Sequence, residues 1–214
     1  MSKYYIISAK GNSWLFLATI SCLFIFTNTI FAQNGDASYN LNSIPVNGVY
    51  NAVFGIQAFS HNTGGDYSTA VGYQALFTNT TGYHNTASGY QSLYYNTIGY
   101  NNTATGTSAL FNNSTGTYNS AHGAYSLFSN NTGYYNTANG VYALVDNTTG
   151  YDNTANGFRA LGLNTTGRSN TVAGCNGLYN NKIGNNNTSL GDSAGFHSLG
   201  VAALYGIFVD TELQ

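Results

Sequence analysis

The chain has 214 residues, of which 26 are glycine, one is proline and only 6% are charged, and its formal net charge is −2. Five cationic residues are too few to neutralise a row of phosphates, so we expect no nucleic-acid partner. The glycine content alone could indicate disorder, but 15% aromatic residues argue for a packed structure.

Residues 1–32 differ in kind from the rest of the chain. Lys3 and Lys10 precede an apolar run from Trp14 to Ala32, and the polar residues 33–35 follow at once. This order predicts a secretory signal peptide, cleaved after about Ala32, and therefore a secreted or outer-cell-surface protein. Two alternatives stay open. The run is about long enough to be a retained membrane anchor, and Cys22 lies within it at a poor match to a lipoprotein motif.

Residues 33–50 are expected to be a lead-in and N-terminal cap. They contain the only proline of the chain, Pro45. The end of a solenoid is an unpaired strand edge, so we expect the last of these residues to pair with the first repeat.

Residues 51–203 consist of nine 17-residue units without insertion or deletion. Glycine holds position 5 of every unit and position 15 of the first eight. A repeat this short forms one coil of a solenoid, and glycine alone adopts positive φ without steric cost, so tight turns are expected at both glycines. The predicted fold is all-β: a parallel β-roll (β-solenoid) of about nine 17-residue coils with two short strands per coil. The units begin at Asn51, Ser68, Asn85, Asn102, Asn119, Asn136, Asn153, Asn170 and Asn187.

The interior of the roll is predicted from positions 3, 8 and 9. Positions 3 and 8 hold mainly alanine-sized residues, which indicates two walls lying close together. Position 9 is large and apolar in eight units. Because neighbouring strand residues face opposite ways, position 9 would point outward and need to be covered by a second chain. The alternative is a strand shifted by one residue, with leucines inside and alanines outside a monomeric rod. The leucines predicted to form this oligomer interface are Leu76, Leu93, Leu110, Leu127, Leu144, Leu161 and Leu178.

Asparagine occupies position 12 in eight units. It tolerates left-handed turns and can bond to its equivalent in the next coil, so we predict a stacked turn ladder. Contact with a sugar is the alternative. The ladder residues are Asn79, Asn96, Asn113, Asn130, Asn147 and Asn164.

Two other columns are candidate surfaces. Position 16 carries Tyr83, Tyr100, Tyr134 and Tyr151, an aromatic stripe suited to a sugar or protein ligand, although stacked tyrosines also stabilise β-rolls without a ligand. Position 2 is threonine or serine in eight units, which strand propensity explains. Ice binding is the alternative for this column, but position 4 supplies no second threonine column.

The last unit departs from the pattern at positions 9, 12 and 15, and residues 204–214 form a tail with Asp210 and Glu212 near its end. A degenerate terminal repeat is typical of a cap. A segment cut from a longer protein would look similar.

Residues that carry catalytic or metal chemistry are scattered. The four histidines fall at positions 4, 11 and 17, and the two that share a position lie eight units apart. After the leader Cys175 is the only cysteine, so no intrachain disulfide is possible. We therefore predict no catalytic residues, no metal site and no cofactor.

The segments NTASGYQSL, NTANGVYAL and NTANGFRAL, each followed by an NTTG-like turn, resemble the repeats of trimeric autotransporter adhesin heads and of bacterial and phage tail fibres. The resemblance covers about 150 of the 214 residues. It implies a left-handed parallel β-roll in which three chains lie side by side, and thus a homotrimer. The heptads, barrel strands and chaperone domain of those families do not appear in residues 204–214, so the resemblance does not say how the rod is anchored.

The function expected from the sequence is that of a secreted or cell-surface structural or adhesive protein, a non-catalytic head or fibre segment. Its ligand would be a host-cell, matrix or glycan surface. The alternative is a monomeric or self-assembling solenoid that binds ice or forms an extracellular matrix.

Overall fold

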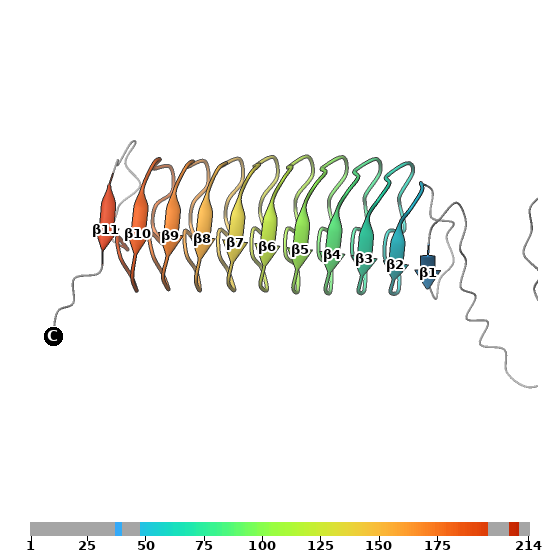
Figure 1. The fold of residues 1–214 in the computed structure, drawn as a ribbon, viewed down its shortest axis with the longest axis horizontal. Coiled ribbons are helices and arrows are strands. Elements are labelled where there is room, and N and C mark those ends of the chain that lie inside the picture. Colours follow the sequence, from blue (N-terminus) through green and yellow to red (C-terminus); the bar gives the residue numbers. More distant parts are fainter. Residues whose placement is uncertain (1–36, 40–47, 197–205, 210–214) are drawn as a thin grey trace, which may run out of the picture.

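The computed structural model describes residues 37–39, 48–196 and 206–209. Their strands form one parallel sheet, in which each strand lies beside its neighbours in chain order along a straight rod (Figure 1). This confirms a parallel β-solenoid with 17-residue coils. The eleven strands are β1 (Ala37–Tyr39), β2 (Ala52–Phe54), β3 (Thr69–Val71), β4 (Thr86–Ser88), β5 (Thr103–Thr105), β6 (Ser120–His122), β7 (Thr137–Asn139), β8 (Thr154–Asn156), β9 (Thr171–Ala173), β10 (Thr188–Leu190) and β11 (Ile207–Val209).

The register is uniform from β2 to β10, where each residue pairs with its counterpart in the next unit, as Ala87 does with Ala104. The two ends differ. Ala37 pairs with Ala52, so the first coil is two residues short, whereas Thr188 pairs with Ile207, so the last is two residues long. The lead-in and the tail thus each add a strand to the sheet.

Residues 1–32, which carry the predicted signal peptide and its alternatives, lie outside the described residues. Within the part of the chain that the structure describes, no helix is long and apolar enough to cross a membrane.

Within the described residues each coil contains one strand, at positions 2–4, and the expectation of two strands per coil is wrong. On the other side of the coil, positions 7 and 9 have positive φ: Gln74 has φ 54° and Leu76 has φ 52°. This segment still forms hydrogen bonds with both neighbouring coils. The Gln74 backbone amide donates to the Ile56 carbonyl (3.0 Å), and the Leu76 backbone amide donates to the Ser92 carbonyl (3.0 Å). The backbone is therefore satisfied between coils without being extended.

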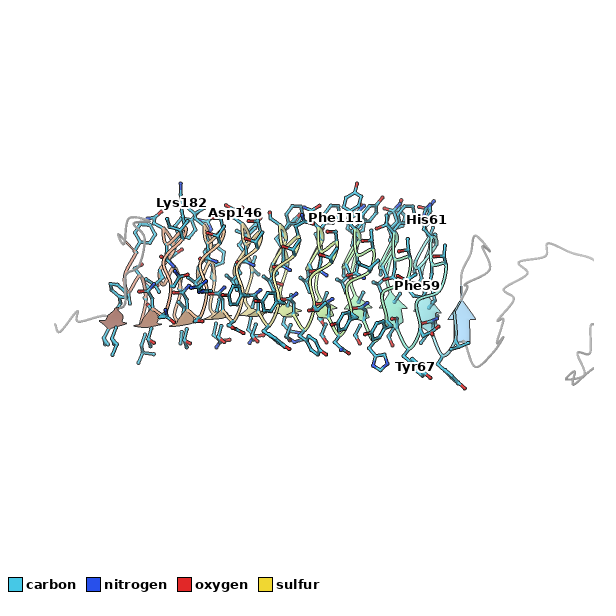
Figure 2. The ribbon with its side chains drawn as sticks, turned by 90° about the horizontal axis from the view of Figure 1, so that it is seen from above. Phe59, His61, Tyr67, Phe111, Asp146 and Lys182 are labelled. Atoms are coloured by element: carbon cyan, nitrogen blue, oxygen red, sulfur yellow. The ribbon has the colours of Figure 1, made fainter. Side chains whose placement is uncertain are left out.

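The prediction that the leucines at position 9 form an oligomer interface is also wrong. The left-handed residue at position 9 breaks the strand alternation, so the side chains at positions 8 and 9 both enter the interior. Ala143 and Leu144, for example, are both fully buried within a single chain. The alternative of a strand shifted by one residue, with the alanines outside, is wrong as well, because the alanines at position 8 also lie inside. Figure 2 shows Phe59, which holds position 9 in the first unit, inside the rod. The leucines that are fully buried in this way are Leu76, Leu93, Leu110, Leu127, Leu144, Leu161 and Leu178.

The two glycine columns have different causes. At position 5 the glycines have φ between 117° and 152°, and a methyl group on Gly123 would lie 2.6 Å from the Gly140 carbonyl carbon. Gly133, at position 15, is not among the positive-φ glycines, but a methyl group there would overlap the Asn130 side chain. Position 15 therefore requires glycine because of close packing and not, as the sequence suggested, because of a left-handed turn.

Candidate binding surface

The asparagines at position 12 form a ladder inside the rod. The Asn130 side-chain amide donates to the Asn113 side-chain oxygen (2.8 Å) and to the Gly133 carbonyl of its own coil (3.1 Å). The Asn147 amide in turn donates to the Asn130 oxygen (2.7 Å). The predicted ladder is thus present, and its asparagines are buried away from a sugar ligand. Its fully buried members include Asn79, Asn96, Asn113, Asn130, Asn147 and Asn164.

A second asparagine ladder runs along position 1. The Asn102 backbone amide donates to the Asn85 side-chain oxygen (3.0 Å), and the Asn102 side-chain amide donates to the Gly116 carbonyl (2.8 Å). The Gly116 carbonyl also accepts from Asn113 of the first ladder (3.0 Å). Both ladders therefore meet at the position 15 glycine. We did not predict this second ladder, although asparagine at position 1 of eight units was the signal for it.

The tyrosines at position 16 form two separate pairs. The Tyr83 and Tyr100 rings are stacked with centroids 4.8 Å apart, and the Tyr134 and Tyr151 rings with centroids 4.7 Å apart. Thr117 holds the same position in the coil between the pairs. Position 16 alone is thus not a continuous stripe.

Tyrosines at position 17 join these pairs. Tyr118 stacks on Tyr135 with centroids 5.0 Å apart and makes an edge contact with Tyr100 at 5.5 Å. Tyr135 makes an edge contact with Tyr134 at 5.5 Å, which links the two pairs. The tyrosines at position 17 were not predicted, although tyrosine directly beside the position 16 column was their signal. We call the whole row the aromatic ridge; it consists of Tyr50, Tyr67, Tyr83, His84, Tyr100, Tyr118, Tyr134, Tyr135 and Tyr151.

Most of the aromatic ridge is exposed, whereas Tyr100 and Tyr151 are half-buried. Tyr67 and Tyr135 are 54% and 55% exposed, and Tyr134, among the less exposed tyrosines of the ridge, is still 38% exposed. At the C-terminal end the Arg168 guanidinium lies 5.6 Å from the centre of the Tyr151 ring, a cation–π contact. An exposed aromatic surface of this length is typical of an interaction site.

A second aromatic row lies on the other side of the rod. At position 10, Phe77, Tyr94, Phe111 and Phe128 are stacked with successive centroids 4.9, 5.1 and 5.0 Å apart. These rings are half-buried, and burial raises the pKa of the Tyr94 phenol. Figure 2 shows Phe111 on the side of the rod opposite the strands, whereas Tyr67 of the ridge lies on the strand side.

The threonine column at position 2 lies in register across the sheet. Thr86 pairs with Thr103, and Thr137 pairs with Thr154. Position 4 holds Ser88 and Thr105, and in the other strands histidine, asparagine or an apolar residue. The sheet face therefore carries one regular hydroxyl column and one mixed column.

In the residues that the structure describes, no group of three or more His, Cys, Asp or Glu side chains is placed to hold a metal ion. Comparison of the chain with protein-family models, with curated proteins and with solved structures gave no match. The resemblance to adhesin and tail-fibre repeats is therefore supported only by the parallel β-solenoid itself.

Proposed function

We propose that this chain is the elongated repeat segment of a secreted or cell-surface protein with an adhesive or structural role, and that it is not an enzyme. The aromatic ridge is the observation that carries this proposal. Solenoids present extended surfaces to their partners, and exposed aromatic rows are typical of such surfaces. The interior, by contrast, is filled by alanine, leucine and asparagine side chains that contact the neighbouring coils.

The proposal does not include the homotrimer that the adhesin resemblance implies. The leucine column that required a second chain is covered within one chain. Because the leucine column needs no second chain to cover it, we expect the rod to be stable as a monomer, and light scattering of the purified protein measures this directly.

Export is tested by expressing the full chain in a bacterial host and sequencing the N-terminus of the secreted or surface-bound protein. We expect the exported chain to begin at about Gln33 and to be cleaved by protease added to intact cells. A chain that lacks residues 2–32 is the control and should stay inside the cell. A full-length chain that is retained in the cytoplasm would contradict the proposed location.

Adhesion is tested with beads coated with the purified rod, which should adhere to cell, matrix or glycan surfaces more strongly than beads coated with an unrelated protein. Equal adhesion of both kinds of bead would contradict an adhesive role and leave a structural one.

A second candidate function is binding to an ordered lattice such as ice. The threonine column, in register over β3 to β10 and interrupted only by Ser120, favours it. The test is whether the protein shapes ice crystals. The variants Thr86→Lys and Thr137→Lys, in the middle of the face, should lose that shaping. Ice crystals of ordinary shape with the parent protein would eliminate this candidate.

A further inference from the structure

We propose that the aromatic ridge binds a neutral, linear polysaccharide that lies along the rod. This inference rests on the proposed extracellular role and names the ligand class for its surface.

The aromatic ridge is continuous although it draws on two columns. Neither column is aromatic throughout, because position 16 lacks tyrosine at Thr117 and position 17 lacks it at Asn101. Where one column lacks a ring the other supplies it, since Tyr118 follows Thr117 and Tyr100 precedes Asn101. Stacking within one column would stabilise neighbouring coils but would not require this exchange. A ligand that runs along the edge of the rod does require it.

The rings of the ridge also have suitable chemistry. The parallel pairs Tyr83–Tyr100 and Tyr134–Tyr151 have centroid separations of 4.8 and 4.7 Å, longer than the roughly 3.5–4.0 Å of direct carbon contact, so their rings are offset. Tyr83, Tyr118 and Tyr134 remain 42%, 44% and 38% exposed. A tyrosine offers an apolar body and a polar tip. The sugar units of a linear polymer offer the matching apolar faces and hydroxyl groups at regular intervals.

The ridge carries charged residues only near its two ends. Asp66, beside Tyr67, already accepts a hydrogen bond from the Val49 amide (2.8 Å). At one end of the ridge Asp152 follows Tyr151 in the chain, and the Arg168 guanidinium lies over the Tyr151 ring. The long middle of the ridge carries neither a row of cations for an acidic polymer nor a row of anions for a basic one, which favours a neutral ligand over an acidic glycan or a nucleic acid.

The test measures binding of the full chain to insoluble cellulose, chitin, xylan and mannan by co-sedimentation, with heparin as the acidic polymer. We expect binding to at least one neutral polymer. Tyr83→Ala/Tyr100→Ala should weaken that binding roughly tenfold or more, because two ring contacts are lost. Tyr83→Phe/Tyr100→Phe keeps the rings and should retain part of the affinity.

The chain provides a matched control. Tyr73 and Tyr90 stack with centroids 5.3 Å apart and are 41% and 50% exposed, but they hold position 6, after the strand rather than before it. Tyr73→Ala/Tyr90→Ala removes the same side chains and should leave binding unchanged. Circular dichroism melts of both variants show whether each remains folded.

Lack of binding to all four neutral polymers would overturn the inference, as would equal binding by the two alanine variants or binding to heparin alone. A parent protein that dimerises, with dimerisation lost in the ridge variant, would assign the ridge to a second copy and also overturn it. An exported rod that adheres to cells independently of the ridge would refute this inference and leave the proposed function intact.

Discussion

At the scale of the residue, the unusual feature is leucine in a left-handed backbone conformation. Leu127 and its equivalents have φ between 47° and 52°. Such a conformation costs a residue other than glycine roughly 1–2 kcal/mol, whereas full burial of a leucine side chain contributes about 1.5–3 kcal/mol. Burial therefore outweighs the strain by a small margin in each coil, and the coil keeps its leucine only while the side chain stays buried.

The first prediction concerns Leu127→Ala in the middle of the rod. The change removes a fully buried side chain and should lower the free energy of unfolding by about 2–5 kcal/mol. Chemical denaturation measures this loss. Thr132→Ala, at an exposed position of the same coil, is the control and should have little effect. Because the leucine is covered within its own chain, the molecular mass in solution should not change; dissociation of an oligomer on this substitution would refute the assignment.

The eighth unit shows how two residues compensate for each other. Val172 replaces the usual alanine at position 3, and Gly177 replaces alanine or serine at position 8. A methyl group on Gly177 would lie 2.6 Å from the Val172 Cγ1 atom. The larger side chain thus occupies the space that the smaller residue leaves.

The second prediction is a double-mutant cycle at this pair. Gly177→Ala alone should overpack the coil and destabilise it by about 1–3 kcal/mol, and Val172→Ala alone should leave a cavity. The double variant restores the alanine pair found in coils such as that of Ala138 and Ala143, and should be more stable than the sum of the single changes indicates, by about 0.5–3 kcal/mol. Additive effects in urea denaturation would show that the two side chains do not compensate.

At the scale of the coil, the sequence predicted what repeats in register and missed what depends on backbone conformation. The 17-residue step, the parallel stacking and the position 12 ladder follow from the spacing of glycine and asparagine alone. The single strand and the inward leucines depend on positive φ at residues such as Gln74 and Leu76, and neither residue type indicates that conformation. The position 17 half of the aromatic ridge was not predicted, because the ridge is continuous only when positions 16 and 17 are taken together.

The third prediction tests the buried ladder. Asn130→Ala removes two donated bonds and one accepted bond, and it leaves the Gly133 carbonyl with one donor fewer. Each buried polar group left without a partner costs about 1–3 kcal/mol, so we expect a loss of several kcal/mol, measured by thermal or chemical unfolding.

An exposed asparagine pair supplies the control for this ladder. The Asn139 side-chain amide donates to the Asn156 side-chain oxygen (2.7 Å) on the outer sheet face. Because water can replace this bond, Asn156→Ala should change stability by only about 0.5 kcal/mol or less. Similar losses for Asn130→Ala and Asn156→Ala would show that burial of the ladder does not matter.

At the scale of the whole molecule, each coil contacts mainly the coils before and after it. From β2 to β10 each strand pairs with the next at the same register, and the described strands form a single sheet without crossovers. Stability in such a rod is approximately a sum over coils and their interfaces. The length of the rod is therefore adjustable in whole coils but not in fractions of one.

The fourth prediction uses this property. Deletion of residues 119–135 removes one coil and joins Tyr118 to Asn136, so that Ala104 can pair with Ala138 and Asn102 can accept from Asn136 as it now does from Asn119. The shortened rod should fold, lose about 4.8 Å of length in small-angle scattering, and unfold at a slightly lower temperature. Deletion of residues 119–134 removes one residue fewer and leaves an 18-residue coil at the junction, so the two halves of the rod are shifted by one residue relative to each other. That variant should be less stable than the 17-residue deletion, because the alanines, leucines and asparagines on the two sides of the junction no longer meet their partners. If the two deletion variants are destabilised to the same extent, the coils do not act as interchangeable units.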